Sequence, residues 1–160
     1  MFNRGTANLV ITEDGVRAIN NTLGNLVMDS GAKAALLLEK SGQLIAAQGE
    51  TNAFDTMSLS ALITGSFSSN KAIAGLIGET EFRKMFQQGK QSSVYMALLE
   101  TGDLISVIFS NQITIGKIKF KVEQILDTLN EQMKAMYNST PETPFKPASP
   151  SAAPKLNDLF

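Results

Sequence analysis

The side chains best suited to metal chemistry are three carboxylates, Glu123, Asp127 and Glu131, which recur every four residues. On a helix this spacing places them on one face, where their oxygens could bind a divalent cation. No histidine or loop oxygen completes such a site, so a solvated helix face is the better interpretation. The chain also has no Cys, His or Trp, which excludes thiol nucleophiles, Cys/His zinc sites and Ser-His-Asp triads. We therefore expect no catalytic site, no metal and no cofactor.

Motifs for nucleotides, nucleic acids and membranes are also missing. Gly75 and Gly78 complete neither of the common phosphate-binding glycine motifs. Fourteen basic and fifteen acidic residues give a net charge of −1, and Lys117, Lys119 and Lys121 are too few to attract nucleic acid. The N-terminal residues are not followed by an apolar stretch of signal-peptide length, so we expect no signal peptide, and no apolar run reaches the roughly 18 residues of a spanning helix. The sequence predicts a cytoplasmic protein that neither binds nucleic acid nor inserts into a membrane.

One predicted helix, over residues 55–77, has two faces of different character. Large apolar side chains are expected to face a sheet: Leu59, Ile63, Phe67, Ile73 and Ile77. The opposite side carries small residues, here called the small ridge: Ala61, Gly65, Ser68, Ala72 and Gly75. A solvated face would normally carry Lys, Glu or Gln, which are better helix formers than Gly or Ser.

A ridge of small residues lets another backbone approach closely. We therefore predict a partner-binding surface at Ala61, Gly65, Ser68 and Ala72. The alternatives are an ordinary Ala/Ser-rich helix and a helix buried within its own monomer.

The composition changes sharply near residue 138. All five prolines lie between positions 141 and 154, and the residues around them offer little apolar surface to compensate for ordering. We expect a folded domain over residues 5–137 and a disordered, proline-rich tail over residues 138–160. The tail ends in an apolar motif, Leu156, Leu159 and Phe160, whose i, i+3, i+4 spacing suits docking into a groove. The alternative for this terminal motif is a frayed end.

The remaining elements follow from hydrophobic periodicity and turn signals. We expect helices over 12–29, 55–77 and 115–136, and strands over 32–39, 43–48, 94–99 and 104–109. Segment 79–91 has helical spacing and is expected to form a short helical turn, with an extra short strand before Val94 as the alternative. The order α-β-β-α-β-β(-β)-α predicts an α+β sandwich, in which helices cover both faces of an antiparallel sheet.

The strand over residues 94–99 is apolar on both faces. If it lay at the edge of the sheet, its unpaired backbone groups would invite aggregation. Pairing it with a second copy across a two-fold axis would remove that edge. We therefore predict a homodimer whose contact strand includes Val94, Tyr95 and Met96.

Several runs of residues coincide with a known family. They are 34–45, 54–62, 76–79 (Leu-Ile-Gly-Glu), 81–82 (Glu-Phe), 88–89 (Gln-Gly), the strand around Tyr95, 108–111 and 115–117. Over roughly residues 8–137 the chain resembles the Roadblock/dynein light-chain superfamily and, within it, the bacterial MglB-type proteins. At the position of Ser68 relatives often carry Ala or Gly.

This resemblance implies a homodimer with one continuous sheet and with the two second helices together on one face. It implies that this face receives a small Ras-like GTPase of the MglA type. The protein would then be a GTPase-activating protein in cell polarity or motility, acting without an arginine finger. The alternative is a non-catalytic dimeric scaffold that binds a GTPase or another partner. An enzyme in its own right has little support, because no acid-base pair or nucleophile emerges.

Overall fold

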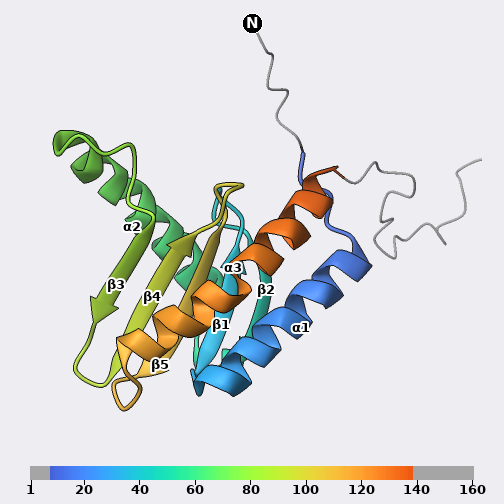
Figure 1. The fold of residues 1–160 in the computed structure, drawn as a ribbon, viewed down its shortest axis with the longest axis horizontal. Coiled ribbons are helices and arrows are strands. Elements are labelled where there is room, and N and C mark those ends of the chain that lie inside the picture. Colours follow the sequence, from blue (N-terminus) through green and yellow to red (C-terminus); the bar gives the residue numbers. More distant parts are fainter. Residues whose placement is uncertain (1–7, 139–160) are drawn as a thin grey trace, which may run out of the picture.

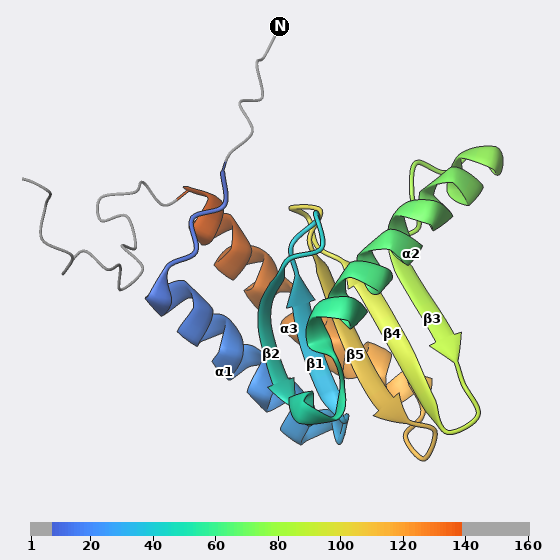
Figure 2. The ribbon, with the colours of Figure 1, turned by 180° about the vertical axis from the view of Figure 1, so that it is seen from behind.

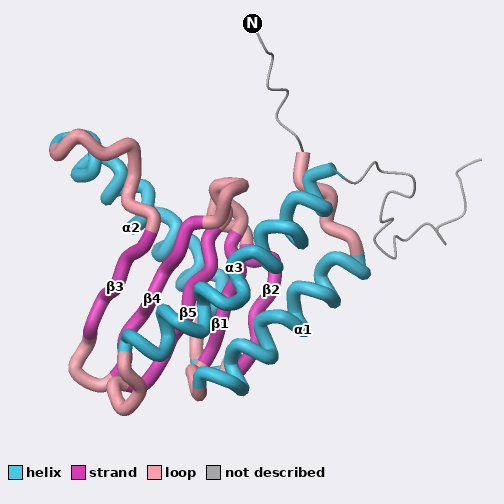
Figure 3. Tube along the Cα trace, viewed as in Figure 1, coloured by secondary structure: helices cyan, strands magenta, loops and turns pink. Residues whose placement is uncertain are grey.

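Five antiparallel strands form one sheet in the order β2-β1-β5-β4-β3 in the computed structural model, which describes residues 8–138 (Figure 3). Their bounds are β1 Ala34–Leu38, β2 Leu44–Gly49, β3 Lys84–Gln88, β4 Ser92–Leu98 and β5 Leu104–Ser110. The helices are α1 Glu13–Ser30, α2 Thr56–Leu76 and α3 Ile115–Asn138, with a short 3-10 turn, η1, at Thr51–Ala53. The α+β sandwich expected from the sequence is confirmed.

The helices cover the two faces of the sheet unequally. Helices α1 and α3 lie side by side on one face, and α2 crosses the other (Figures 1 and 2). Side chains of successive strand residues point to opposite faces, so each strand feeds two cores. In β1, Ala35 and Leu37 join the core beneath α1 and α3, whereas Leu36 and Leu38 join the core beneath α2.

The helix ends lie where the capping residues predict them. The Thr12 hydroxyl accepts a hydrogen bond from the Gly15 N–H at 3.0 Å, which starts α1, and Gly31 ends it in the left-handed conformation. At the end of α2, Gly78 has a φ of +86°, and the Glu79 N–H donates to the Ala74 carbonyl at 2.9 Å. This is a Schellman ending, which favours glycine because only glycine adopts that φ without strain.

Segment 79–91 differs from the expected helical turn. Residues 84–88 form strand β3, which pairs with β4 in the register Phe86 opposite Tyr95. The Phe86 ring stacks on Phe109 with centroids 6.1 Å apart, while Met85 packs against the core beneath α2. The side chains therefore alternate with a period of two. The helical spacing was misleading, and the alternative of an extra strand before Val94 is correct.

Strand β4 is not the free edge of the sheet. It pairs with β5 on one side and with β3 on the other. The prediction that Val94, Tyr95 and Met96 pair with a second copy is therefore wrong, because both edges of their strand are already hydrogen-bonded. The prediction assumed that β4 lies at the edge of the sheet, because segment 79–91 was not recognised as containing β3, the strand that pairs with β4.

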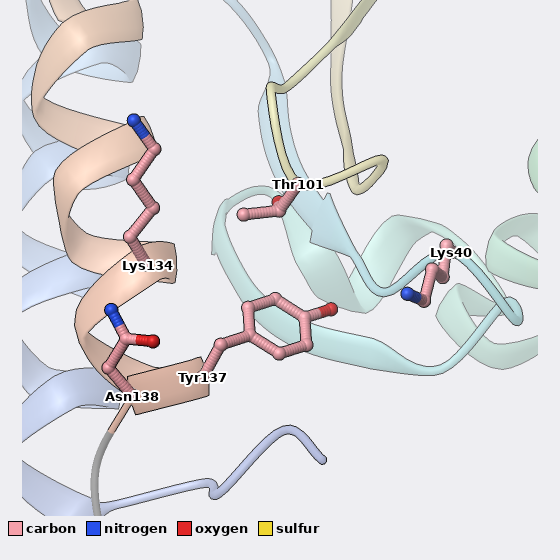
Figure 4. Close-up of a pocket in the computed structure, with 5 residues that line it drawn as sticks. All are labelled: Lys40, Thr101, Lys134, Tyr137 and Asn138. Carbon is pink, nitrogen blue, oxygen red and sulfur yellow. The ribbon is translucent and has the colours of Figure 1, made fainter. Parts of the chain in front are cut away.

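A buried carboxylate holds together the end of the sheet where the hairpins turn. Asp103 is fully buried and accepts hydrogen bonds from the Lys40 N–H, the Thr101 hydroxyl and the Tyr137 hydroxyl, at 3.0, 2.5 and 3.0 Å. Figure 4 shows Tyr137 reaching from the last turn of α3 towards the hairpin loops that carry Thr101 and Lys40. The Lys40 Nζ lies 5.6 Å from the centre of the Tyr137 ring. These contacts line a cavity of about 250 Å³ and fasten the end of α3 to both hairpins.

The stability of the protein should depend on the titration of Asp103. Burial raises the pKa of this carboxyl above its ordinary value of 3.8, against the opposing effect of its three hydrogen bonds. The folded state therefore holds this proton to higher pH than the unfolded state. The contribution of Asp103 to the free energy of unfolding must then fall as the pH rises from 3.8 through the folded pKa. Urea unfolding across this range should show the free energy of unfolding of the wild type falling relative to that of Asp103→Asn as the pH rises, and a rise relative to Asp103→Asn would contradict the expectation.

Candidate functional site

Helix α2 begins at a well-formed cap. The Asp55 carboxylate accepts hydrogen bonds from the Ser58 N–H at 3.2 Å and from the Ser58 hydroxyl at 2.8 Å. These bonds to Ser58 lower the pKa of Asp55, so the cap keeps its charge at neutral pH. The cap fixes where the helix starts, and therefore which residues face the sheet.

The inward face of α2 is only partly the one that the sequence predicts. Ile63 and Phe67 are buried against the sheet and Leu59 is half-buried, as expected. Ile73 and Ile77, however, are 52% and 67% exposed, so the expectation that they face the sheet is wrong. The physical reason is visible in Figure 2, where the C-terminal part of α2 projects past the strands. No strand lies beneath that part of the helix, so these two side chains have no sheet to cover.

The small ridge lies on the outward face. All five of its members are exposed. A Cβ atom added at Gly65 or Gly75 would meet nothing within 4 Å, and neither glycine has a positive φ. Packing within the described part of the chain and backbone geometry therefore do not require glycine at either position. Each glycine nevertheless costs the helix about 0.5–1 kcal/mol relative to alanine, which suggests that the space is kept open for something outside the chain.

Exposed large apolar side chains beside the ridge were missed by the sequence analysis. Of the nine large hydrophobic residues left exposed within residues 8–138, five belong to α2 or its end: Met57, Leu62, Ile73, Leu76 and Ile77. Leu62 and Leu76 are 71% and 88% exposed. A helical-wheel projection explains why these residues were missed. The inward face was expected to be centred near Leu59, whereas the buried residues of α2 are centred about 80° away from it. The face opposite that centre holds Leu62, Gly65 and Leu76 together.

Three polar side chains of α2 donate hydrogen bonds to carbonyl groups of the same helix. The Ser60 hydroxyl donates to the Thr56 carbonyl at 2.5 Å, Ser69 to the Gly65 carbonyl at 3.0 Å, and the Asn70 amide to the Ser66 carbonyl at 2.9 Å. Lys71 is the only charged residue of the helix. The outward face of α2 is thus an apolar surface with little desolvation cost, which is typical of the core of a protein interface.

A cavity of about 250 Å³ lies at the flank of this surface, between α2 and the hairpin turns. Ser68, Lys71, Lys40 and Glu81 line it. The hydroxyl of Thr64 also lines it and is buried without a hydrogen-bond partner among the described residues. The cavity offers a partner side chain both hydrogen bonds and charge next to the small ridge.

Other candidate residues lie elsewhere or outside the described chain. Glu123 forms an ion pair with Lys84, and Glu131 lies 3.8 Å from Lys134, so neither faces a shared cation. No group of three potential metal ligands occurs within residues 8–138. None of the helices in this range is long and apolar enough to cross a membrane. The terminal motif, Leu156, Leu159 and Phe160, lies outside the described residues.

Residues 18–109 match the family model of the Roadblock/LC7 domain. The chain belongs to the Roadblock/LC7 family. Its structure resembles that of Myxococcus xanthus MglB with a TM-score of 0.75 and 32% sequence identity, covering 82% of this chain and 99% of that one. This similarity places it among the MglB-type Roadblock proteins.

Two more distant structures share the Roadblock fold. The gliding protein MglB from Thermus thermophilus has a TM-score of 0.74 and 22% identity, covering 79% of this chain and 96% of that one. Myxococcus xanthus MglC has a TM-score of 0.51 and 10% identity, covering 72% and 98%. No curated protein sequence matches the chain. At these identities the two structures support the fold and do not test the residues of the small ridge.

Proposed function

We propose that this Roadblock protein is a non-catalytic regulator that binds a small Ras-like GTPase of the MglA type and accelerates its GTP hydrolysis. The similarity to MglB supports the class of partner. The observation that carries the proposal is the outward face of α2, where two glycines keep open space that the described part of the chain does not need. The partner would contact Ala61, Gly65, Ser68 and Ala72, with Leu62 adding apolar area.

The composition of this face bears on how hydrolysis would be stimulated. Helix α2 contains no arginine. Of the two arginines within residues 8–138, Arg17 lies on α1, on the other face of the sheet, where it pairs with Glu13 and Asp14, and Arg83 directly precedes β3. Helix α2 itself therefore supplies no arginine finger, the group that stabilises charge on the transferred phosphate in other activators. The activator would act by positioning the residues and switch segments of the GTPase itself.

We further propose that the protein works as a homodimer joined at β3. This strand is a free edge of the sheet, and most of its residues are exposed. Antiparallel pairing of β3 with its copy would satisfy its unpaired backbone groups. It would also bring together two copies of the projecting end of α2, and so cover Ile73, Leu76 and Ile77. Polarity or motility of a bacterial cell is the process in which such a regulator would act.

A multiple-turnover GTP hydrolysis assay tests the proposal. An MglA-type GTPase is measured alone and with increasing amounts of this protein, and we expect the turnover rate to rise with saturation. The matched control is the same titration with the GTPase omitted, which should give no hydrolysis. Binding of the GTPase without any rise in rate would instead favour the dimeric scaffold. If the protein neither binds the GTPase nor raises its turnover rate, both proposed functions are contradicted.

A further inference from the structure

A second apolar surface lies on the opposite face of the molecule from α2. A cavity of about 410 Å³ opens between β3 and the first turns of α3, next to Phe86, Ile115 and Gly116. A smaller cavity of about 230 Å³ lies nearby and shares Phe86 and Ile115 with it. We call the two together the α3–β3 cleft. Phe86, which lines both cavities, is 41% exposed. The cleft therefore has an apolar wall that is not fully covered within residues 8–138.

A buried hydroxyl without a partner lines the cleft. Tyr95 lines the larger cavity and is only 1% exposed. Its hydroxyl has no hydrogen-bond partner among the described residues. Burial and the nearby Glu123 carboxylate raise the pKa of this phenol to about 12. The hydroxyl is therefore protonated at neutral pH and needs an acceptor. Such unsatisfied buried donors are rare in folded proteins and call for an explanation.

A half-exposed ion pair lies at the rim, close to Tyr95. Lys84 lines the cleft and pairs with Glu123, the carboxylate that acts on Tyr95. Both side chains are about half-exposed, and ion pairs of this kind contribute little to stability. The pair can therefore swing aside and let a bound group reach the Tyr95 hydroxyl.

The start of α3 adds donors at the same place. The N–H groups of Ile115 and Gly116 have no acceptor among the described residues, as expected for the first turn of a helix. Lys119, which lines the larger cavity, makes no ion pair within residues 8–138. The cleft thus favours an apolar ligand that carries a carbonyl or carboxylate oxygen.

We propose that the α3–β3 cleft is the docking site of the chain's own terminal motif, Leu156, Leu159 and Phe160. The three apolar side chains match the apolar residues that line the two adjoining cavities, and Asp158, between Leu156 and Leu159, carries the acidic oxygen that the rim favours. The backbone carbonyls around Asp158 are further acceptors for Tyr95. This proposal does not depend on the GTPase, because it concerns a different face of the molecule.

The length of the intervening chain permits this docking. Helix α3 has 24 residues and is therefore about 36 Å long. It leads away from the cleft to Asn138, so the tail must return along that distance. The 17 residues at 139–155 span up to about 58 Å when extended. A tether of this kind gives an effective concentration on the order of millimolar, so even a weakly binding motif occupies the cleft for much of the time.

A spin label on the full-length protein tests the proposal. The chain has no cysteine, so Ser151→Cys provides a single labelling site just before the motif. We expect the amide signals of Phe86, Gly116 and Lys119 to lose most of their intensity, compared with the same sample after the label is reduced. The amide signals of Leu62 and Ala72 on α2 should keep theirs. Loss on α2 instead, or at neither surface, would overturn the proposal.

Two further variants decide whether the cleft and the motif cause the effect. Gly116→Leu should abolish the intensity loss, because a Cβ there meets nothing within 4 Å and a leucine side chain would fill the cavity that Gly116 lines. Its matched control is Lys117→Leu, an exposed position that lines neither cavity, which should leave the loss unchanged. Replacing Leu156, Leu159 and Phe160 with serine should also abolish it without touching the folded domain. Persistence of the intensity loss in either the Gly116 variant or the serine variant would show that the tail does not dock as proposed.

Discussion

The double replacement Ser68→Arg and Ala72→Arg is expected to abolish binding of the GTPase while leaving the protein folded. Both residues are exposed on the outward face of α2, so the new side chains can extend into solvent in the free protein. Arginine is a better helix former than serine and nearly as good as alanine. At a closely packed docking face, however, two long cations would separate the surfaces and lose their hydration without a counter-ion.

The expected loss of affinity is at least about 100-fold, which corresponds to roughly 3 kcal/mol. It is measured by calorimetric titration of the GTPase and by the hydrolysis assay. A matched control is Gln124→Arg with Thr128→Arg, which places the same pair at the same spacing on an exposed face of α3. The control should bind normally. Normal binding by the α2 variant would exclude this face, whereas a monomeric or unfolded α2 variant would show that these residues are buried in the dimer.

Hydrophobic period and capping chemistry were sufficient to predict the three long helices. The apolar stripe of α1 includes Ile19, Leu23 and Leu26, which are all buried, and Thr12 and Gly31 mark its two ends. These signals are local, because a cap involves residues only three or four positions apart. Residues 117–122 also alternate between apolar and polar as a strand would, but α3 follows the longer 3/4 pattern from Ile115. Local signals therefore predict elements well where they are long and amphipathic.

Strand β3 shows where local signals end. Its sequence, Lys-Met-Phe-Gln-Gln, is mostly polar and exposed, so neither burial nor strand propensity distinguishes it. It is a strand because β4 supplies a complete ladder of hydrogen-bond partners beside it. That partnership depends on the tertiary fold and on the hairpin at Gly89, where the N–H donates to the Ser92 carbonyl at 3.0 Å. Missing this strand also misplaced the edge of the sheet.

The candidate docking face was predicted in outline but not in its full extent. Periodicity placed Gly65 and Ser68 on the outward face, and both are exposed. Periodicity alone could not reveal that α2 continues beyond the sheet. How far the helix projects depends on the width of the sheet and on the direction in which the helix crosses it. Ile73 and Ile77 are exposed for that reason. The apolar area available to a partner or to a second copy is therefore larger than the small ridge indicated.

The free edge of β3 leads to the second large expected effect, in which Gln88→Pro converts the dimer into monomers. The Leu98 N–H donates to the Arg83 carbonyl, and the Gly89 N–H donates to the Ser92 carbonyl. Hydrogen-bonded pairs alternate along an antiparallel ladder. The backbone N–H and C=O groups of the residues in between, Lys84, Phe86 and Gln88, therefore point away from β4. Proline at residue 88 thus removes an outward N–H and leaves the pairing with β4 unharmed.

Two-fold symmetry places this change twice in every dimer. Two lost hydrogen bonds and the bulk of two proline rings should cost on the order of 2 kcal/mol or more, so the dissociation constant of the dimer rises roughly 30-fold or further. Light scattering at micromolar concentration measures the mass, and circular dichroism checks that the fold survives. Gln88→Ala is the matched control, since it shortens the same side chain but keeps the N–H, and it should remain dimeric. If the proline variant is still a dimer while the sheet is intact, the copies meet at another surface, and the exposed end of α2 with Ile73 and Leu76 becomes the first place to mutate.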